Sequence, residues 1–203
     1  MYTPAHFAER RPGELAALMR AHPLATVVVQ GEDGLVANLL PLLLDETRQV
    51  LRGHVARANP LWRLAGEGLA ALVLFHGPQG YVSPSHYPSK AEHGRVVPTW
   101  NYAVVEVHGR LRAIDDRAWL GDLVERLTAQ HEAASAVPWR PGDAPADYLD
   151  RMLAAIVGVE LAIERVAGKF KLSQNRDAAD RAGVIAGLAG SPLAEMMASL
   201  DGA

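Results

Sequence analysis

The sequence predicts an α+β protein whose core is a mainly β, antiparallel small barrel with helices added around it. About six or seven β-like runs rich in Val, Ile and Leu recur along the chain. No helix separates the first three runs, which disfavours the parallel sheet of an α/β protein. Amphipathic or alanine-rich stretches then place helices at the start, middle and end of the chain. Its 203 residues are enough for one such domain.

Turn residues and hydrophobic periodicity set the elements of the first half. Leu15, Leu18 and Met19 recur at helical spacing after a proline suited to a first turn, which predicts a helix over 12–21. Turn-rich connections then separate the β-like runs, and Asn59-Pro60 begins a short helix that ends near Gly66. The expected strands of this half cover 24–30, 35–44, 49–54, 69–75 and, as a short fifth, 81–83.

The second half begins with a polar loop over 84–95, and loops of this length in compact domains tend to be functional or mobile. The run 96–114 alternates apolar and polar residues, which predicts a long strand with one dry face and one wet face, the latter including Glu106 and Arg112. The next expected elements are a helix over 115–131, a proline-rich elbow over 138–145 and a helix over 146–157. A strand over 159–164 follows, and residues 169–173 either continue it or form a hairpin partner for it. The last expected element is a helical tail over 178–200, interrupted at 190–192.

Composition narrows the function classes. With no cysteine, the chain has no disulfide, thiolate nucleophile or Cys-ligated centre. A formal net charge of -3 argues against a strong binder of nucleic-acid backbones. The first residues lack the apolar core of a signal peptide and no window is apolar enough to cross a bilayer, so we expect a cytoplasmic protein.

The familiar nucleotide and hydrolase motifs are absent: there is no G-x-G-x-x-G after a strand, no Walker loop and no G-x-S-x-G. Gly183, Gly187 and Gly190 lie in an alanine-rich helix, where they predict close packing. His131-Glu132 lacks the second histidine of a zinc-protease helix, and the histidines between 54 and 108 have no i, i+4 pair. We therefore expect no metal site.

Three local groups of residues carry candidate chemistry. At 52–60 a strand meets a helix start, where Arg57 and Asn59 suit a phosphate, or else Asn59 merely caps the helix and Arg57 is solvated. At 97–102 a proline interrupts the strand and leaves Thr99 and Asn101 free to face a ligand, the alternative being a core Trp100. At 169–176 a polar run is either a ligand-binding turn or a plain surface connection.

The three lysines give the third group weight. The chain has 20 basic side chains, of which only Lys90, Lys169 and Lys171 are lysine. An arginine-rich coding bias explains the imbalance in general, so the lysines that remain mark positions that need a compact point charge, unless chance placed them.

At these segments the sequence resembles the PaiB family, described as FMN-binding negative transcriptional regulators of the flavin split-barrel superfamily. The resemblance covers the chain to about residue 188 and is carried by MYTPAHF at the start, ANLLPLLL at 37–44, RGHVARANPLW at 52–62, GYVSPSHYPSK at 80–90, VVPTWNYAVVEVHG at 96–109 and IVGVELAIERVAGKFKLSQNR at 156–176. It implies an FMN-binding split β-barrel over 1–188. The remaining residues, 189–203, are expected from their alanine-rich pattern to form a C-terminal helical tail. The resemblance also implies a homodimer with FMN at the subunit interface.

By analogy with that superfamily, the resemblance implies three groups of cofactor-binding residues. The phosphate and ribityl chain are expected near His54, Val55, Ala56, Arg57 and Asn59, with Lys90 as a second charge. The isoalloxazine is expected near Asn38, Leu39, Thr99, Trp100 and Asn101. Lys171, Gln174 and Asn175 are expected to close the site, as residues of the same chain or of the partner.

Two functions of different class follow from FMN binding. The first is a flavin-dependent sensor or negative regulator, although no helix-turn-helix with a basic recognition helix is visible and Arg181 is the only basic residue in 177–200. The second is a small FMN-dependent oxidoreductase or flavin reductase, in which His86, Tyr87 and His93 of the polar loop are candidate acids or bases or else belong to a structural lid. Heme handling is a third, weaker option.

Overall fold

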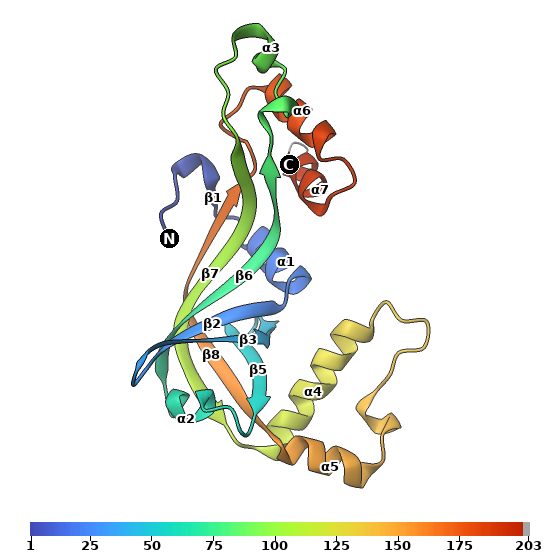
Figure 1. Cartoon of the computed structure of the whole chain (residues 1–203). Coiled ribbons are helices and arrows are strands. Elements are labelled where there is room, and N and C mark those ends of the chain that lie inside the picture. The colour runs from blue at the N-terminus through green and yellow to red at the C-terminus, as the bar shows by residue number, and fades with distance from the viewer. Residues whose placement is uncertain (201–203) are drawn as a thin grey trace. The chain divides into compact units, whose positions relative to one another are not determined.

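The computed structural model describes residues 1–200, and the chain divides into two compact units. The terminal unit contains residues 1–21, 75–106 and those from 167 onward. The central unit contains residues 22–74 and 107–166. Each long strand labelled β6, β7 and β8 in Figure 1 begins in one unit and ends in the other.

An eight-stranded sheet is the main element of the fold. Its order is β3-β2-β6-β7-β8-β5-β4, with β1 paired to β8, and the sheet is not closed into a ring. The pairings of β2 with β3 and β6, and of β5 with β4 and β8, are antiparallel. The strands are β1 Ala8–Glu9, β2 Leu24–Gly31, β3 Gly34–Pro41, β4 Leu43–Asp45, β5 Val50–Ala56, β6 Leu69–Val82, β7 Thr99–Ile114 and β8 Ile156–Lys171. This confirms the predicted α+β class with an antiparallel, split barrel.

The helices follow the predicted order, except that α3 lies inside the segment 84–95 that was predicted as a loop. The α-helices are α1 Pro12–Ala21, α2 Leu61–Ala65, α3 Ser89–His93, α4 Arg117–Glu132, α5 Ala146–Ala154, α6 Ala178–Gly187 and α7 Pro192–Ser199. Single 3₁₀ turns occur at Ala5–Phe7, Pro84–His86 and Pro141–Asp143. The predicted helix over 12–21 is confirmed at both ends, and the helical tail breaks at 190–192 as predicted.

In the central unit, α4 supplies much of the packing. Asp116 caps its first turn by accepting a hydrogen bond from the Trp119 N–H at 2.7 Å. Leu120, Leu123 and Leu127 of α4 are buried, and Leu123 and Leu127 pack with Leu43 of β4. Trp119 lies against Gly158 of β8, where a Cβ would be 2.3 Å from the indole, so only glycine leaves room for that ring.

In the terminal unit, the polar loop that follows β6 packs on α6. A Cβ at Gly183 would lie 2.2 Å from the carbonyl oxygen of His86, and one at Gly187 would lie 2.0 Å from the His86 ring. Ser89 of α3 donates hydrogen bonds from its N–H and its hydroxyl to the buried Asp180 carboxylate, at 3.1 and 2.7 Å. The predicted close packing at these two glycines is therefore confirmed, and its partner is the loop.

Four other expectations need correction. The predicted strands 69–75 and 81–83 are one continuous strand, β6. Residues 35–44 form two strands because the chain breaks between Pro41 and Leu43. The helix expected over 146–157 ends at Ala154, because Ile156 already pairs with Ala56 in the sheet.

The fourth correction concerns the wet face of β7. Glu106 is only 4% exposed, and its carboxylate binds the N-terminal amino group at 3.2 Å, so this part of the face is not open to solvent. Arg112 on the same strand is exposed, as expected.

The C-terminal segment stays within the terminal unit as far as the described residues go. Met197 of α7 is buried, and its carbonyl accepts a hydrogen bond from Arg181 of α6. The boundary between a domain over 1–188 and a tail over 189–203 stays a prediction, and its last residues, 201–203, lie outside the described part of the chain. Across residues 1–200, no helix has both the length and the apolar character needed to cross a membrane.

Candidate functional site

The fourteen residues expected to bind FMN divide evenly between the two units. The central unit contains Asn38, Leu39, His54, Val55, Ala56, Arg57 and Asn59. The terminal unit contains Lys90, Thr99, Trp100, Asn101, Lys171, Gln174 and Asn175.

In the central unit, Asn38 and Asn59 come together. The Asn59 side-chain amide donates to Asn38 Oδ1 at 2.8 Å, and Asn59 Oδ1 accepts from the Leu61 N–H at 2.9 Å. Asn59 therefore caps the start of α2, as one of the two interpretations held, and ties that start to β3. Leu39, next to Asn38, is 66% exposed.

Arg57 is held by a carboxylate and by main-chain oxygens. Its two terminal nitrogens donate to Asp115 at 2.7 and 2.6 Å, and Nε donates to the Ala154 carbonyl at 2.8 Å. The hydrogen bond with Arg57 lowers the pKa of Asp115, so this pair stays ionised at neutral pH. The alternative that Arg57 is simply solvated is wrong, and its charge is already paired within the central unit.

His54 lines an apolar cavity of about 550 Å³, together with Pro41 of β3, His131 and Leu127 of α4, and Trp139 of the elbow. Its Nδ1 is buried and has no hydrogen-bond partner among residues 1–200. Burial lowers the pKa of His54, which favours a neutral imidazole. Such a ring suits a flat ligand better than it suits a phosphate. Its neighbours Val55 and Ala56 differ in exposure, since Val55 is buried and Ala56 exposed.

In the terminal unit, Lys171 joins two of the predicted ring-binding residues. Its Nζ donates to Thr99 Oγ1 and to the Trp100 carbonyl, both at 2.5 Å. Burial lowers the pKa of Lys171, and the charges of Lys169 and Arg176 lower it further. Lys169 and Arg176 therefore each lie close enough to Lys171 to disfavour its charged form. Within residues 1–200, no carboxylate lies within ion-pair distance of Lys171.

Trp100 is 49% exposed, so the alternative of a core tryptophan is wrong. Its indole N–H donates to Gln79 Oε1 at 3.1 Å, and its ring lies 6.3 Å from the ring of Tyr81, which is also exposed. Nearby on β8, the Lys169 ammonium lies 5.3 Å from the Tyr102 ring centre. Exposed rings and cations thus occur together on this part of the terminal unit.

Asn101 is buried, and only one end of its side-chain amide has a hydrogen-bond partner among the described residues. Its side-chain amide donates to Ser173 Oγ at 2.8 Å, whereas its Oδ1 has no partner among the described residues. Ser173 lies in the polar run 169–176, so this run contacts the β7 segment that was expected to bind the ring. A buried amide oxygen without a partner is costly unless something else donates to it.

The other three predicted residues of the terminal unit differ in exposure and in hydrogen bonding. Gln174 folds back on its own turn, accepting from the Leu172 N–H at 2.7 Å and donating to the Phe170 carbonyl at 2.6 Å. Asn175 and Lys90 are exposed. Lys90 donates to Ser85 Oγ at 3.3 Å within its own loop.

The loop candidates for acid or base chemistry are mostly structural. Tyr87 is 2% exposed, and Arg176 lies 4.7 Å from its ring centre. His86 packs against the glycines of α6. His93 is exposed, and its Nδ1 accepts from the Arg95 N–H at 3.0 Å.

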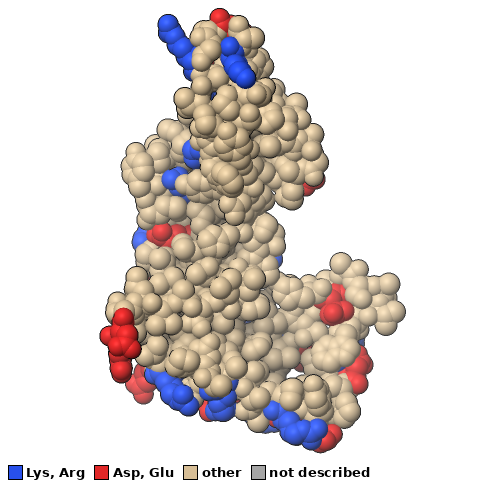
Figure 2. Space-filling view, in the orientation of Figure 1, with Lys and Arg blue, Asp and Glu red and all other residues tan. Residues whose placement is uncertain are grey.

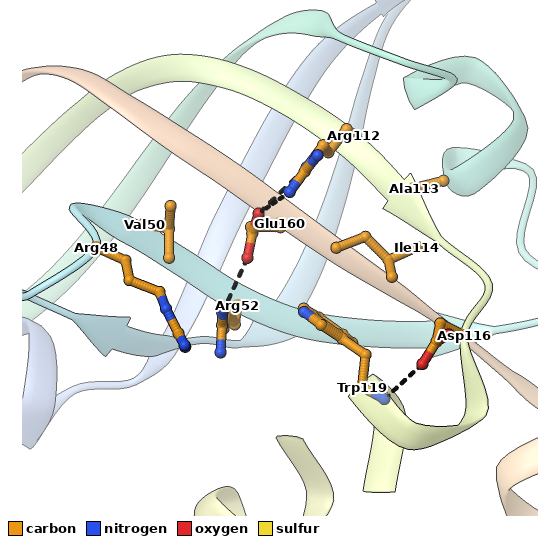
Figure 3. Close-up of a pocket in the computed structure, with 9 residues that line it drawn as sticks. All are labelled: Arg48, Val50, Arg52, Arg112, Ala113, Ile114, Asp116, Trp119 and Glu160. Atoms are coloured by element: carbon orange, nitrogen blue, oxygen red, sulfur yellow. Dashed lines mark hydrogen bonds and ion pairs between the residues drawn. The ribbon is translucent and has the colours of Figure 1, made fainter. Parts of the chain in front are cut away.

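A further cavity could not be predicted from the sequence. It belongs to the central unit, measures about 710 Å³ and is lined by Arg48, Arg52, Arg112, Trp119 and Glu160 among others (Figure 3). The alternation that put Arg112 on the polar face of a strand was the available signal. It did not show that Glu160 on a neighbouring strand lies beside it.

Comparison with known proteins places the chain in a family. Residues 1–165 match the family model described as "Putative FMN-binding domain". An uncharacterised protein of Emericella nidulans is 35% identical over 92% of this chain and 90% of its own length. The protease synthase and sporulation protein PAI 2 of Bacillus subtilis is 30% identical over 98% of this chain and 96% of its own length. The expected PaiB resemblance is thereby confirmed.

Solved structures agree on the fold. The FAD and heme binding protein from Mycobacterium smegmatis has a TM-score of 0.64 at 20% identity, covering 87% of this chain and 78% of its own. The flavocytochrome Anf3 from Azotobacter vinelandii has a TM-score of 0.60 at 17% identity, covering 87% of this chain and 75% of its own. FMN, the cofactor expected from the sequence, is the one that the family description names, and the chain belongs to this FMN-binding family.

Proposed function

We propose that this chain is a homodimeric FMN-binding protein that acts as a flavin-dependent sensor or PaiB-like negative regulator. The near end-to-end match to PAI 2 supports the role, and the group of cations around Lys171 is the observation that carries the binding. The seven expected residues of each unit remain candidates for holding FMN. The proposal keeps the cytoplasmic location expected from the sequence.

The residues present fit the chemistry of FMN, which combines a flat ring with polar edges and an anionic phosphate. Lys171 offers positive charge, with Lys169 and Arg176 nearby, and no ion pair of Lys171 with a carboxylate occurs among the described residues. Trp100 offers an exposed ring, and Asn101 has a buried oxygen that lacks a donor. In the central unit, the His54 cavity is apolar enough for a flat ring. Bound FMN would supply the capacity to accept and donate electrons.

Six of these residues have proposed roles in holding the cofactor. Lys171 attracts an anionic group, with Thr99 and the Trp100 carbonyl fixing its ammonium in place. Asn101 accepts a hydrogen bond from a polar edge of the ligand. Asn38 and Asn59 keep the start of α2 tied to β3, next to the strand that carries His54.

The homodimer is proposed from the exposed face of β3, which is the last strand at one edge of the sheet. Leu35 and Leu39 on alternate positions of β3 are 76% and 66% exposed, and Leu24 at the start of β2 is 55% exposed. A second copy of the chain would bury these side chains. Light scattering on a size-exclusion column tests this, and a monomer at micromolar concentration would contradict it.

Regulation is proposed to act without direct DNA contact. Figure 2 shows basic and acidic side chains interspersed over the face drawn, with no broad basic surface. Arg181, on α6, donates hydrogen bonds to the carbonyls of Leu172 and Met197. A regulator of this kind would act through a protein partner or a metabolite.

The lack of a basic recognition helix also favours the alternative, a small FMN-dependent oxidoreductase or flavin reductase. The side chain that would move protons in that reaction stays unassigned. His93 is the most accessible of the three loop candidates.

One set of measurements tests the proposal and separates the alternatives. FMN is titrated into the purified protein and followed by flavin fluorescence; the proposal expects saturable binding, and its absence would overturn it. DNA binding at physiological salt and FMN reduction by NAD(P)H are then measured on the same sample. NAD(P)H turnover would favour the oxidoreductase, and sequence-selective DNA binding would overturn the indirect mode.

A further inference from the structure

The arginine cavity of the central unit combines a buried cation, two exposed cations and a flat apolar wall. Arg52 on β5 lies directly opposite Glu160 on β8, and Arg112 reaches the same carboxylate from β7 (Figure 3). Trp119 of α4 forms one wall, with Val50 and Ile114 as further apolar lining. None of the fourteen residues expected to bind FMN lines this cavity.

Two guanidinium groups share the Glu160 carboxylate. Arg52 Nε donates to Oε2 at 2.9 Å, while Arg112 donates to Oε1 from Nη2 at 2.6 Å and from Nε at 3.2 Å. Glu160 therefore carries one negative charge against two positive charges. Because it is 6% exposed, solvent screens this imbalance poorly.

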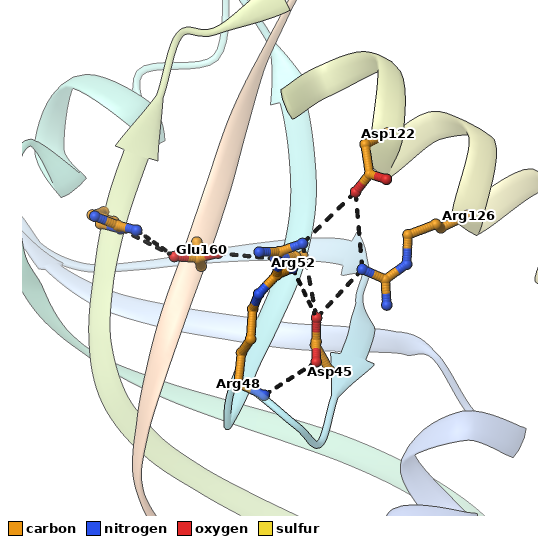
Figure 4. Close-up of polar contacts among 7 residues, drawn as sticks. Asp45, Arg48, Arg52, Asp122, Arg126 and Glu160 are labelled. Atoms are coloured by element: carbon orange, nitrogen blue, oxygen red, sulfur yellow. Dashed lines mark hydrogen bonds and ion pairs between the residues drawn. The ribbon is translucent and has the colours of Figure 1, made fainter. Parts of the chain in front are cut away.

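Arg52 is only partly satisfied by its other neighbours. Its Nη1 lies 3.9 Å from Asp45 Oδ2 and 3.8 Å from Asp122 Oδ2, which is too long for hydrogen bonds. Asp45 meanwhile accepts hydrogen bonds from Arg48 and Arg126 at 3.4 and 3.3 Å. The residues joined in Figure 4 thus comprise four arginines, Arg48, Arg52, Arg112 and Arg126, and three carboxylates, Asp45, Asp122 and Glu160. Asp116, which also lines the cavity, is engaged in capping α4.

The guanidinium of Arg52 also stacks near the indole, with its central carbon 5.4 Å from the Trp119 ring centre. A buried Arg52 that is 6% exposed is therefore fixed in direction by Glu160 on one side and by Trp119 on another. A preorganised guanidinium beside a flat ring suits a planar anion, because little side-chain freedom is lost on binding.

We propose that this cavity binds a small aromatic monocarboxylate, with its ring against Trp119 and its carboxylate among Arg48, Arg52 and Arg112. The residues that line the cavity include three arginines, Arg48, Arg52 and Arg112, and two carboxylates, Asp116 and Glu160. The lining therefore has one excess positive charge, which matches one ligand carboxylate, and the volume of about 710 Å³ admits a ring of one or two cycles. Such a ligand could serve as the metabolite to which a regulator responds. The proposal does not depend on FMN binding.

The test uses the full chain and three probes followed by isothermal titration calorimetry. Benzoate has the ring and the charge, benzamide has the ring alone, and inorganic phosphate has charge without a ring. We expect saturable benzoate binding, with benzamide and phosphate each at least about tenfold weaker. No saturable benzoate binding up to about 10 mM, which corresponds to less than about 3 kcal/mol of affinity, would overturn the proposal. Equal binding of phosphate or of benzamide would also overturn it.

Two exposed arginines allow variants that leave the buried pair in place. Arg48→Gln and Arg112→Gln are each expected to weaken benzoate binding about tenfold. Arg110→Gln is the matched control, because Arg110 lies on the same strand as Arg112 but pairs with Glu164 at the surface at 3.5 Å. Equal affinities for all three variants would contradict the proposal, provided their melting temperatures match the wild type. Competition by FMN would assign the cavity to the flavin and overturn it as a separate site.

Discussion

The two regions that contain the predicted cofactor residues differ in the groups that bind their positive charges. At the junction of β5 and α2, Arg57 is paired with Asp115 through two hydrogen bonds. At the ends of β7 and β8, Lys171 is held by a hydroxyl and a carbonyl, which are neutral groups. A carboxylate cancels a charge, whereas neutral acceptors only position it. Lys171 is therefore the cation that is free to attract an anionic ligand.

The regions also differ in how they are fixed. The junction is held by the ion pair and by hydrogen bonds from Arg57 to main-chain carbonyls. Near the lysine, the loop after β6 is held by close packing of His86 on Gly183 and Gly187. An ion pair depends on pH and salt, while packing of this kind depends on volume. The comparison can therefore be tested with changes of charge in one region and changes of volume in the other.

The largest effect is expected from Lys171→Met. Removing this charge should weaken FMN binding at least about tenfold, since a hydrogen bond from a charged donor is worth roughly 1.5–3 kcal/mol. The fluorescence titration with FMN measures it. Lys171→Arg should also weaken binding, because a planar guanidinium cannot replace a compact ammonium between Thr99 and the Trp100 carbonyl. The surface change Arg110→Lys is the control; if it behaves like Lys171→Arg, the rarity of lysine in this chain is only composition.

The second effect tests the packing of the lysine region. Gly183→Ala should lower the free energy of unfolding by about 2 kcal/mol, because its Cβ would lie 2.2 Å from a main-chain oxygen that has little room to move. Gly121→Ala in α4 is the matched control: its Cβ meets open space, and it should stabilise the helix by up to about 1 kcal/mol. Urea unfolding of both variants provides the measurement. Similar stabilities for the two variants would mean that the loop is not docked on α6.

The sequence predicted the elements better than the boundaries between them. Helix α1 was predicted at both ends because Pro12 and His22-Pro23 are local signals. Strand β6 was predicted as two pieces because its Gly-Pro-Gln-Gly segment resembles a turn. In the structure Gly77 continues the strand, and its Cβ would meet Leu18 at 2.8 Å and Ala103 at 3.2 Å. A glycine required by close approach and a glycine required by a turn look alike in a sequence.

The site was less predictable for a similar reason. Motif position alone nominated Arg57 and Lys171 equally, because their partners are far away along the chain. Asp115 is 58 residues from Arg57, and Thr99 is 72 residues from Lys171. The arginine cavity went unnoticed because Arg52, Arg112 and Glu160 come from three strands whose neighbours were not known from the sequence.

A smaller effect is expected when the charge pairing of the junction is removed. Arg57→Gln should shift urea unfolding to lower concentration at pH 7 and change FMN affinity less than about threefold, because the arginine's charge is already paired. Asp115 has its pKa lowered below 3.8 by Arg57, so its stabilising contribution is complete above that value and is lost as pH falls through the folded-state pKa. The stability difference between wild type and variant should therefore shrink in acid. A large loss of FMN affinity would instead make Arg57 a direct ligand.

The smallest effect is a change in pH dependence from His54 in the central unit. Burial lowers its pKa below 6.5, so between the folded value and 6.5 the unfolded chain binds more protons than the folded chain. Stability must then rise with pH over that window and be lost as pH falls below 6.5. His54→Leu should reduce the slope of the unfolding free energy against pH by an amount that corresponds to less than one proton. Part of the slope should remain, because burial also lowers the pKa of His22. Thr128→Val lines the same cavity without titrating and should leave the slope unchanged. An unchanged slope in His54→Leu would mean that water reaches the imidazole. That result would contradict the proposal that this apolar cavity holds a flat ring.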